Sequence, residues 1–433
     1  MNPAETEITL SPVLPGAVAP TWPEARWVGE LDYHRPPETR YCLEGSEGYS
    51  WARLLVRDGR RLLGFAEVPI TDGVLDPIVL HRALADLSAE PLSSAPSPRT
   101  GDEPGLRSVT VVVCTRDRAE MLEVALRSIL TGSHPRFDVV VVDNAPSTDA
   151  TLQCVTDLAD SRVRVVTEPA PGLSRARNRG LMSTDSDIVA FTDDDVVVDP
   201  NWLTELVAGF DAADDVACVC GIVPSGELRT PAQMYFDQRV GWARSCRDRT
   251  YSMDSPPEDV PLFPFQVGIF GTGANFAVDR RTITRLGGFD EGLGAGSPTA
   301  GGEDLDMFFR VLDAGHRLRY QPSAVVWHRH RDENSALAAQ SRGYGLGLGA
   351  WLTKIALDRR TARRAVHTTI VNARTFLALS RRMSRDARPK AELSPLLPPG
   401  VGTIELLSIL RGPAAYARAR RQGRSATPLQ SLR

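Results

Sequence analysis

The chain has 433 residues, of which 42% are hydrophobic and 24% charged, and its formal net charge is −4. This length predicts two or three domains, and the composition is that of a folded globular protein, which excludes a chain disordered throughout. Its only lysines, Lys354 and Lys390, lie beyond the motifs described below. A P-loop and a pyridoxal enzyme each need a lysine at the site, so neither class is expected. The six cysteines form no C-x-x-C pair or zinc-type cluster and are interpreted as buried thiols.

Residues 1–90 are predicted to form an accessory β-rich domain. Its clearest element is a hairpin within Ser50–Val68, because the pair Asp58-Gly59 favours the positive φ angles of a two-residue turn. Residues 91–107 are rich in Pro, Ser and Gly, which is the composition of a linker.

Neither a signal peptide nor a membrane span is expected from the sequence. The first residues include Glu5 and Glu7 and lack the basic segment of a signal peptide. No apolar run is long enough to cross a bilayer. We therefore expect a cytoplasmic protein.

Strands alternate with helices from residue 108 to about 345. Runs of β-branched residues predict strands buried on both faces, and segments of helical periodicity separate them. The expected strands are Val109–Cys114, Val139–Val142, Val163–Val166 and Ile188–Thr192, and the expected helices are Ala119–Leu130, Thr148–Leu158 and Ser174–Met182. This alternation predicts an α/β domain with a mostly parallel sheet, whose functional groups gather at the carboxyl ends of the strands. Residues 346–433 are predicted to form a helical, arginine-rich region with a flexible tail.

Three adjacent carboxylates, Asp193, Asp194 and Asp195, directly follow the fourth of these strands. Because adjacent like charges repel, their placement at a strand end suggests a bound cation. Short Asp side chains suit Mg²⁺ or Mn²⁺ shared with substrate phosphates. A solvated acidic turn, or a cap for the helix that begins near Asn201, is the alternative.

Two further motifs lie at predicted strand ends. Asp143 follows the second strand and can accept hydrogen bonds from a base or a ribose, although an Asx turn fits it equally well. Arg175, Arg177 and Arg179 open the third helix, where guanidinium groups and the helix N-terminus both suit phosphate. A solvated basic helix face is the alternative interpretation.

Two motifs follow in the second half of the chain. Flexible glycines precede a helix start that carries Glu303, Asp304 and Asp306. Capping the helix needs only one of these acids. One of the others can act as a general base. His328 and His330 flank an arginine, and either can ligate a metal. Taken alone, so short a motif fits a surface role equally well.

In their order along the chain, these motifs resemble the family 2 glycosyltransferases of the GT-A fold over about residues 108–332. The motifs are Thr115-Arg116-Asp117-Arg118, Asp143-Asn144, Arg175-Ala-Arg177-Asn178-Arg179-Gly180, Asp193-Asp194-Asp195, Gly271-Thr-Gly-Ala-Asn275, Gly287-Gly-Phe-Asp290-Glu291, Gly302-Glu303-Asp304-Leu-Asp306 and the histidine pair. A sugar nucleotidyltransferase or a dinucleotide oxidoreductase would carry a Gly-rich loop after the first strand. This chain has Cys114-Thr-Arg-Asp there instead.

The resemblance implies an inverting glycosyltransferase that moves a sugar from a nucleoside-diphosphate sugar, with UDP favoured, to a hydroxyl of an acceptor. The acceptor is a glycan, a lipid-linked molecule, a peptide or a small molecule. By the same resemblance Asp195 and His328 ligate Mn²⁺ or Mg²⁺, and the catalytic base is Asp304, with Glu303 as the second candidate. The implied nucleotide-sugar-binding residues are Thr115, Asp117, Asp143, Arg175, Arg177, Asn178, Asp193 and Asp194. In such a reaction the base takes the acceptor proton while the cation neutralises the leaving diphosphate.

Further expectations concern regions without such motifs. Residues 224–268, which include Trp242, are predicted to form a mobile loop on the acceptor side, where aromatic rings stack on sugars or simply bury a helix. The arginine-rich C-terminal region can lie on an anionic membrane, at the inner face of the plasma membrane, although packing on the catalytic domain is the plainer interpretation. No nucleic-acid partner is expected.

A second class of function is a catalytically silent GT-A domain that serves as a binding or scaffolding subunit of a polysaccharide assembly system. The joint presence of Asp195, Asp304 and His328 argues against it, because a silent copy has no chemical need for all three.

Overall fold

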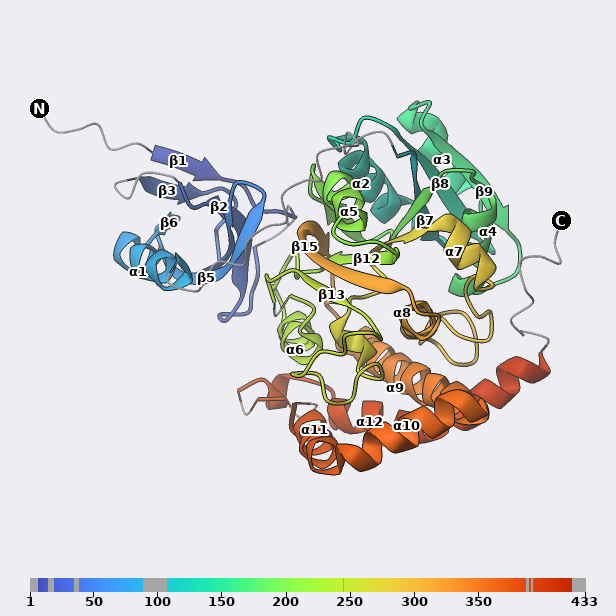
Figure 1. Cartoon of the computed structure of the whole chain (residues 1–433). Coiled ribbons are helices and arrows are strands. Elements are labelled where there is room, and N and C mark those ends of the chain that lie inside the picture. The colour runs from blue at the N-terminus through green and yellow to red at the C-terminus, as the bar shows by residue number, and fades with distance from the viewer. Residues whose placement is uncertain are drawn as a thin grey trace, which may run out of the picture.

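The computed structural model describes residues 7–14, 19–34, 39–88, 107–243, 245–386, 389–390 and 392–422. The predicted linker, apart from its last residue, and the end of the predicted tail lie outside these residues. Figure 1 shows a smaller N-terminal sheet beside a larger sheet covered by helices, with further helices along one side.

The N-terminal sheet has six strands in the spatial order β1-β3-β6-β5-β4-β2, with one helix against β5. The elements are β1 Glu7–Leu10, β2 Arg26–Asp32, β3 Arg40–Leu43, β4 Trp51–Asp58, β5 Arg61–Thr71, β6 Val74–Leu75 and α1 Pro77–Ser88. Strands β4 and β5 form the predicted hairpin, but its turn is shifted by one residue. Asp58 pairs with Arg61, so Gly59 and Arg60 are the central residues, and Gly59 takes the positive φ of +58°.

The larger sheet has nine strands in the described chain, in the order β11-β15-β12-β14-β10-β7-β8-β9, with β13 paired to β15. The strands are β7 Val109–Thr115, β8 Phe137–Asn144, β9 Val163–Glu168, β10 Ile188–Thr192, β11 Val196–Val198, β12 Val216–Ile222, β13 Arg249–Tyr251, β14 Asn275–Asp279 and β15 Arg317–His328. The predicted α/β fold is confirmed, and β10-β7-β8-β9 is parallel as expected. The other half is mixed, because β14 runs antiparallel to both of its neighbours.

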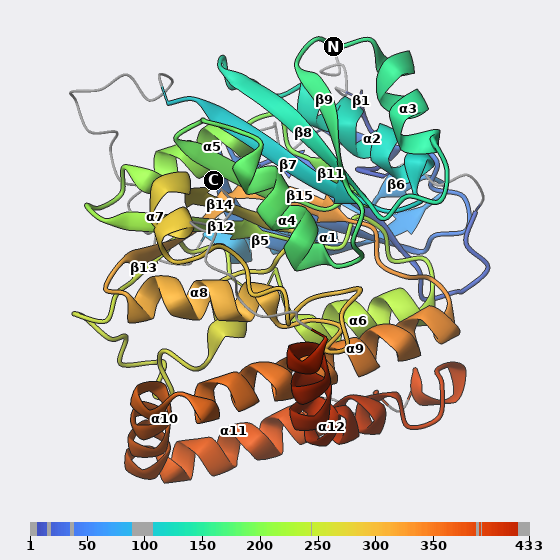
Figure 2. The same cartoon turned by 90° about the vertical axis from the view of Figure 1, so that its right-hand side faces the viewer.

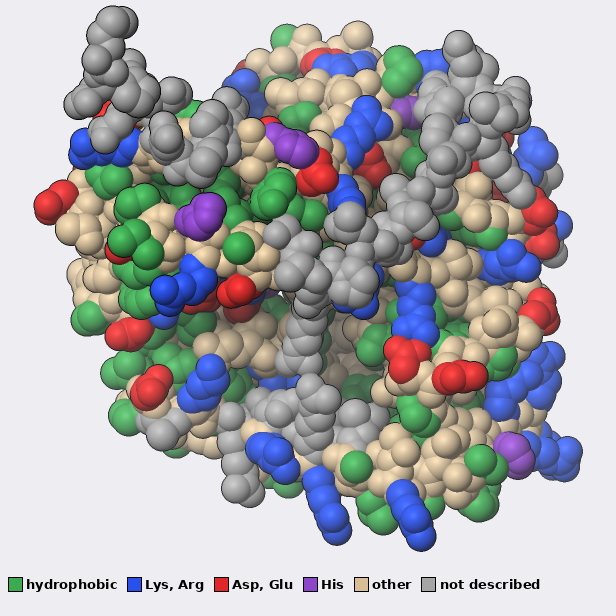
Figure 3. All heavy atoms as spheres, turned by 60° about the vertical axis from the view of Figure 1, so that its left-hand side comes forward, with side chains coloured by type: hydrophobic (Ala, Val, Ile, Leu, Met, Phe, Trp, Pro, Cys, Tyr) green, Lys and Arg blue, Asp and Glu red, His purple; other side chains and the backbone are tan. Residues whose placement is uncertain are grey.

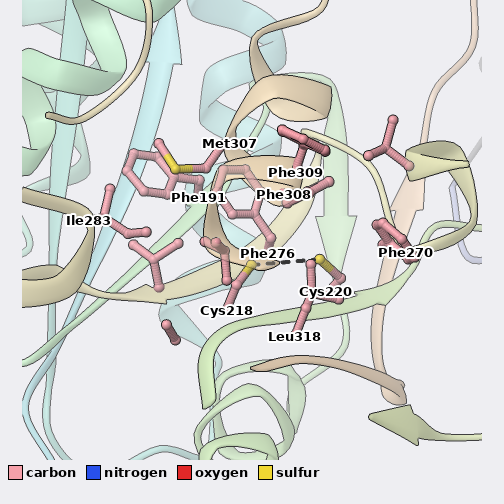
Figure 4. Packing of buried hydrophobic residues seen from close by; sticks show 14 of the residues in the cluster. Phe191, Cys218, Cys220, Phe270, Phe276, Ile283, Met307, Phe308, Phe309 and Leu318 are labelled. Carbon is pink, nitrogen blue, oxygen red and sulfur yellow. Dashed lines mark hydrogen bonds between the residues drawn. The ribbon is translucent and has the colours of Figure 1, made fainter. Parts of the chain in front are cut away.

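Helices cover both faces of this sheet. They are α2 Ala119–Leu130, α3 Ala150–Leu158, α4 Leu173–Met182, α5 Trp202–Phe210, α7 Arg280–Arg285 and α8 Glu303–Asp313. Residues of α2, α3 and α5 share one hydrophobic cluster with the strands, and residues of α4, α7 and α8 share another. Figure 4 shows the second cluster, in which Phe191 and Phe276 stack with ring centroids 5.0 Å apart and Phe308 packs edge-on to Phe276. These packed layers hold the strand ends in fixed positions.

The segment 224–268, predicted as a loop, contains regular structure. Helix α6 spans Pro231–Val240, β13 pairs with β15, and the 3₁₀ helix η1 Val267–Ile269 follows. Thr230 Oγ1 accepts a hydrogen bond from Gln233 N at 3.3 Å, and Pro231 stands at the first helical position. A Thr-Pro start of this kind is a helix signal that the sequence prediction missed.

The C-terminal region is helical, as predicted, with α9 Asn334–Leu357, α10 Arg359–Val371, α11 Ala373–Asp386, the 3₁₀ helix η2 Ser394–Leu396 and α12 Val401–Arg421. Figure 2 shows α9 running beneath α8 and α6, with α10, α11 and α12 farther from the sheet. Among the described residues, no helix combines the length and the apolar character needed to cross a membrane.

Glycines on α9 permit very close packing on two sides. A Cβ on Gly345 would lie 2.1 Å from the carbonyl oxygen of Glu405 in α12, and one on Gly349 would lie 2.1 Å from that of Ile409. A Cβ on Gly347 would lie 2.6 Å from the carbonyl carbon of Gly301, just before α8. Helix α9 therefore packs closely against α12 on one side and against the start of α8 on another.

Buried polar contacts join the N-terminal sheet to the larger one. Arg57 Nη2 lies 2.8 Å from Asp199 Oδ2, and Trp327 Nε1 donates to Glu30 Oε1 at 2.9 Å. Since Trp327 precedes His328 in β15, the N-terminal sheet braces the strand that carries the histidine motif.

Candidate active site

The carboxyl ends of β7, β8 and β10 meet at one edge of the sheet, and β15 adds the histidines to it. In the antiparallel pair of β11 and β15, Val196 lies opposite His328, which places the imidazole beside the aspartates that precede β11. His328 Nε2 lies 3.2 Å from Asp195 Oδ1 and 3.9 Å from Asp193 Oδ2. One ligand atom from each of the three residues lies within 4.8 Å of the others. The sheet register thus assembles a group that can hold a metal ion.

The electrostatics of this group suit a divalent cation. Burial raises the pKa of Asp193 to about 7, with Arg177 opposing the shift and Asp195 adding to it. Burial lowers the pKa of His328, so its imidazole is neutral at pH 7, the form that ligates metals. Burial also disfavours the charge of Asp195, but His328 and two arginines outweigh it and lower the pKa of that carboxyl. Carboxylate oxygens with one imidazole are a donor set for Mn²⁺ or Mg²⁺.

Two arginines that the sequence analysis did not select hold this acidic group together. Arg118 Nη1 lies 2.5 Å from Asp194 Oδ1, and its Nη2 lies 2.8 Å from Asp195 Oδ2. Arg331 Nη2 lies 3.5 Å from the same Asp195 oxygen. Arg118 lies within a motif already recognised, and Arg331 directly follows His330. The signal that could have identified them is a basic residue needed to balance three adjacent acids.

Asp194 is not part of the group that could hold a metal ion. It is buried, and its Oδ2 accepts a hydrogen bond from Thr115 Oγ1 at 2.7 Å. Burial raises its pKa to about 6, Asp195 adds to the shift, and Arg118 opposes it. The hydrogen bond between Thr115 and Asp194 therefore links the end of β7 to the end of β10.

Arg177 connects the aspartate group to the acidic start of α8. Its side chain is only 3% exposed, so the alternative of a solvated basic face does not hold for it. Nη1 donates to Glu303 Oε1 at 2.9 Å, Nη2 donates to the carbonyl of Gly273 at 2.8 Å, and the same Nη2 lies 3.7 Å from Asp193 Oδ1. Its guanidinium also lies over Phe276, 5.6 Å from the ring centroid.

The two acids at the start of α8 differ in their surroundings. Glu303 is buried against Arg177, and burial, with Asp304 adding to the effect, raises its pKa to about 7. Asp304 is partly exposed, and its Oδ2 accepts a hydrogen bond from Gly273 N at 3.0 Å. A Cβ on Gly273 would lie 2.9 Å from Arg177 Nη2 and 3.4 Å from Asp304 Oδ2. A side chain at this position would therefore displace the Arg177 guanidinium from the loop.

Asp306, the third acid of the motif, has a structural position. Its carboxylate is 1% exposed, and Lys354 Nζ on α9 lies 2.7 Å from its Oδ1 and 2.7 Å from Asp290 Oδ2. Arg310 Nε donates to its other oxygen at 2.7 Å. One of the chain's two lysines thus reaches the core beneath the site, although it lies outside the motif region in sequence.

Two residues predicted to bind the nucleotide, Asp143 and Asp117, differ in their hydrogen bonding. Asp143 is buried, its Oδ1 has no hydrogen-bond partner among the described residues, and burial raises its pKa. Asp117 has a φ of +54°, and its Oδ1 accepts hydrogen bonds from Ser147 N at 2.9 Å and Ser147 Oγ at 2.8 Å. Asp143 therefore retains an acceptor for a ligand, while Asp117 holds the loop after β8.

Two other predicted residues make protein contacts of their own. Asn178 donates to the carbonyl of Phe289 at 2.9 Å and accepts from its amide at 2.8 Å, so it anchors the loop before Asp290. Arg175 Nη2 lies 3.0 Å from Glu291 Oε2. The structure places both on α4, on the side that faces residues 287–291.

The histidine pair is buried, which excludes the surface alternative. The rings of His328 and His330 stack with centroids 4.9 Å apart, and His330 lies against Phe236 of α6 at 4.5 Å. The ring of Trp242 lies 6.0 Å from that of His328 and 5.9 Å from that of His330. His328 is the one that reaches the aspartates, and His330 packs behind it.

Comparison with known proteins agrees with this geometry. Residues 110–270 match the family model described as glycosyl transferase family 2. The pre-mycofactocin glycosyltransferase of Mycobacterium tuberculosis is 30% identical over 249 residues, which cover 57% of this chain and 48% of that protein. The glucosyl-dolichyl phosphate glucuronosyltransferase of Haloferax volcanii is 26% identical over 228 residues, which cover 51% of this chain and 69% of that protein. The chain thus spans about half the length of the first of these relatives.

Among solved structures, a mannosyltransferase from Pyrobaculum calidifontis, in complex with GDP-Man and Mn²⁺, covers 78% of this chain and 94% of its own, at 20% identity and a TM-score of 0.48. The family-model match covers residues 110–270 and confirms the resemblance over that segment. This part of the chain is therefore similar to family 2 glycosyltransferases.

Proposed function

We propose that the chain is an inverting glycosyltransferase that transfers a sugar from a nucleoside-diphosphate sugar to an acceptor hydroxyl. The observation that carries the proposal is the convergence of Asp193, Asp195 and His328 with the acidic pair Glu303 and Asp304, joined through buried Arg177. We assign this chemistry to residues 108–345, with residues 1–90 as an accessory unit and residues 346–433 as a supporting helical region.

Asp193, Asp195 and His328 would hold Mn²⁺ or Mg²⁺. Two carboxylates and a neutral imidazole fit such an ion. Burial, with Asp195 adding to the effect, raises the pKa of Asp193 to about 7, and a bound cation would favour the charged form of this carboxyl. When bound, the ion would neutralise charge on the leaving diphosphate. Arg118 and Arg331 keep Asp195 ionised and oriented toward the group.

Asp304 is the proposed general base, with Glu303 as the second candidate. A base must reach the acceptor hydroxyl, and Asp304 is the partly exposed member of the pair. Glu303 is buried and already paired with Arg177, so its role is to fix the guanidinium between the two halves of the site. Displacement at the anomeric carbon on the face opposite the diphosphate then inverts its configuration.

UDP is the favoured donor nucleotide. Asp143 Oδ1, which has no hydrogen-bond partner among the described residues, is buried at the carboxyl end of β8. A carboxylate oxygen can accept a hydrogen bond from the N3–H of uracil. The N1–H of guanine could donate the same hydrogen bond. The calorimetry described next distinguishes the two nucleotides. Thr115, Asp117, Arg175 and Asn178 would shape the same pocket through the loops they hold.

Calorimetry with UDP, GDP and TDP sugars, each with and without Mn²⁺, tests the proposal on wild type and Asp195→Asn. We expect one nucleotide to bind only with Mn²⁺ and this binding to be lost in the variant. If no nucleotide binds under any condition, the enzyme proposal fails and the silent scaffold takes its place.

Contact with an anionic membrane is proposed for the C-terminal helices. Val366 and Ile370 on α10 and Leu377 on α11 are more than half exposed, and Arg363 and Arg374 lie on the same helices. Figure 3 shows basic side chains projecting from the lower edge of the molecule, where these helices lie, with hydrophobic side chains between them. Apolar and basic residues together suit the surface of an anionic bilayer at the inner face of the plasma membrane. Co-sedimentation with anionic vesicles at low salt, compared with neutral vesicles, tests this; equal sedimentation in both would contradict it.

A further inference from the structure

An aromatic side chain absent from every motif above lies between the two halves of the site. Tyr344 projects from α9, whose neighbouring Gly343 and Gly347 lie against residues 300–302, immediately before Glu303 and Asp304. On its other side the Tyr344 ring stacks on Phe236 with centroids 5.8 Å apart, and it meets the edge of Trp242 at 6.4 Å. Phe236 and Trp242 also contact the histidine pair, so Tyr344 extends an aromatic wall that begins at these histidines. The helix that carries Tyr344 packs against the segment just before the acidic pair.

The wall retains an accessible surface. Phe236 is 3% exposed and serves as backing, whereas Tyr344 is 36% exposed. One face of the Tyr344 ring is thus covered by Phe236, and the ring still offers area to a ligand. Small-molecule sites commonly combine such apolar surface with a few polar groups that fix orientation.

The side chain of Gln340, beside the ring, has an oxygen that can accept a further hydrogen bond. Gln340, one turn earlier on α9, donates from Nε2 to the Tyr344 hydroxyl at 3.2 Å. Its Oε1 is buried and has no hydrogen-bond partner among the described residues. Burial raises the pKa of Tyr344, Gln340 opposes the shift, and the charges of Asp304, Asp193 and Asp195 add to it, so the hydroxyl remains protonated and able to donate a hydrogen bond.

We propose that the Tyr344 ring, backed by Phe236 and Trp242, is the platform on which a neutral saccharide acceptor stacks with one hydroxyl directed at Asp304. This rests on the proposed function and specifies its acceptor class. A sugar ring presents C–H groups on one face and hydroxyls at its edge, which matches an aromatic face flanked by an amide and a phenol. An anionic acceptor is disfavoured, because Asp304 lies close by and the platform itself carries no cation.

The test measures acceptor binding separately from donor binding. The full chain is saturated with UDP and Mg²⁺, which is diamagnetic. Methyl glycosides of glucose, galactose, mannose and N-acetylglucosamine are then tested as acceptor probes by saturation-transfer NMR. Tyr344→Leu keeps most of the side-chain volume but removes the flat ring, Tyr344→Phe keeps the ring, and Tyr33→Leu in the N-terminal sheet is the matched control. Donor affinity by calorimetry and the thermal midpoint report whether each variant folds.

We expect at least one glycoside to bind wild type, Tyr344→Phe and Tyr33→Leu, and its affinity to fall about ten-fold or more in Tyr344→Leu while UDP affinity is unchanged. Gln340→Leu, which removes the spare acceptor, is expected to weaken the same glycoside about five-fold. If UDP binds but no neutral glycoside does, or if Tyr344→Leu binds it as wild type does, the platform is overturned while the proposed function stands. Binding of glycosyl phosphates in preference to the neutral glycosides would overturn the acceptor class. Absence of Mn²⁺-dependent UDP binding would instead refute the proposed function.

Discussion

Arg177 on α4 and Glu303 at the first turn of α8 form a buried ion pair, with Nη1 and Oε1 2.9 Å apart. The guanidinium also reaches toward Asp193, so one side chain connects the possible metal group with the acidic pair. Removal of either partner would leave the other buried without its opposite charge. The geometry of the two halves of the site is therefore coupled through Arg177.

Arg177→Ala should lower the free energy of unfolding by about 3–5 kcal/mol, because it leaves Glu303 buried and unpaired. Arg175→Ala, two residues away, is the control. Arg175 is partly exposed and pairs with Glu291, and its loss should cost about 0–1 kcal/mol. Urea unfolding of both variants provides the comparison, and equal effects would contradict a coupling role for Arg177.

Lys354→Ala should lower stability by about 3–5 kcal/mol, since it leaves Asp306 and Asp290 in the core without their shared cation. Lys390→Ala, at an exposed lysine, should have little effect. Thermal or urea unfolding measures both. A mild effect of Lys354→Ala would indicate that Arg310 suffices for Asp306.

The same cluster predicts a loss of wild-type stability in acid. Burial disfavours the charge of Asp306, but Arg310 and Lys354 outweigh it and hold its pKa below the ordinary value of 3.8. A carboxyl with a lowered folded-state pKa stabilises the protein above its unfolded-state pKa, and this contribution is lost as pH falls through the folded-state pKa. The free energy of unfolding should thus decline below about pH 4 in wild type. In Lys354→Ala the decline should be weaker, and an unchanged acid dependence would argue against this assignment.

The glycines of α9 predict a position-specific packing effect. Gly345→Ala would place a Cβ 2.1 Å from the carbonyl of Glu405, so it should destabilise the packing of α12 by about 1–3 kcal/mol. Gly343→Ala, on the same helix, meets its nearest atom at 3.3 Å, and its better helix propensity offsets the contact. Chemical unfolding followed by circular dichroism distinguishes the two. Equal losses would show that backbone propensity, not close packing, selects these glycines.

Metal binding should stabilise the folded chain. If Mn²⁺ occupies the group of Asp193, Asp195 and His328, a concentration 100 times its dissociation constant should add about 2.7 kcal/mol to stability. The shift in thermal midpoint should disappear in His328→Ala and with excess chelator. His34→Ala, at an exposed histidine of the N-terminal sheet, should retain it. A shift that survives His328→Ala would place the ion elsewhere.

The fold of residues 108–192 could be predicted from sequence because its strands are continuous β-branched runs, as in Val109–Thr115, and its helices have clear periodicity. The mixed half of the sheet could not, because the direction of β14 depends on contacts with strands distant in sequence. Helix α6 was missed because its apolar residues, including Phe236, do not follow an amphipathic pattern.

Within the site, the acids and histidines could be recognised as motifs, and the resemblance implied different roles for Asp194 and Asp195. Their contacts could not be predicted, because only the fold shows Asp194 bound to Thr115 and Asp195 beside His328. Tyr344 carries no local signal, since its place beside the acidic pair results from the packing of α9 on residues 300–302.

The most direct test of the central claim separates donor binding from turnover. UDP release from a UDP-sugar is measured with Mn²⁺ and a saccharide acceptor for wild type, Asp304→Asn and Glu303→Gln, together with donor affinity for each. We predict that Asp304→Asn binds the donor as wild type does but loses about 10²–10⁴-fold in turnover, the usual contribution of a general base. Full turnover in Asp304→Asn, with donor binding intact, would contradict the assignment of the base and with it the mechanism proposed for this site.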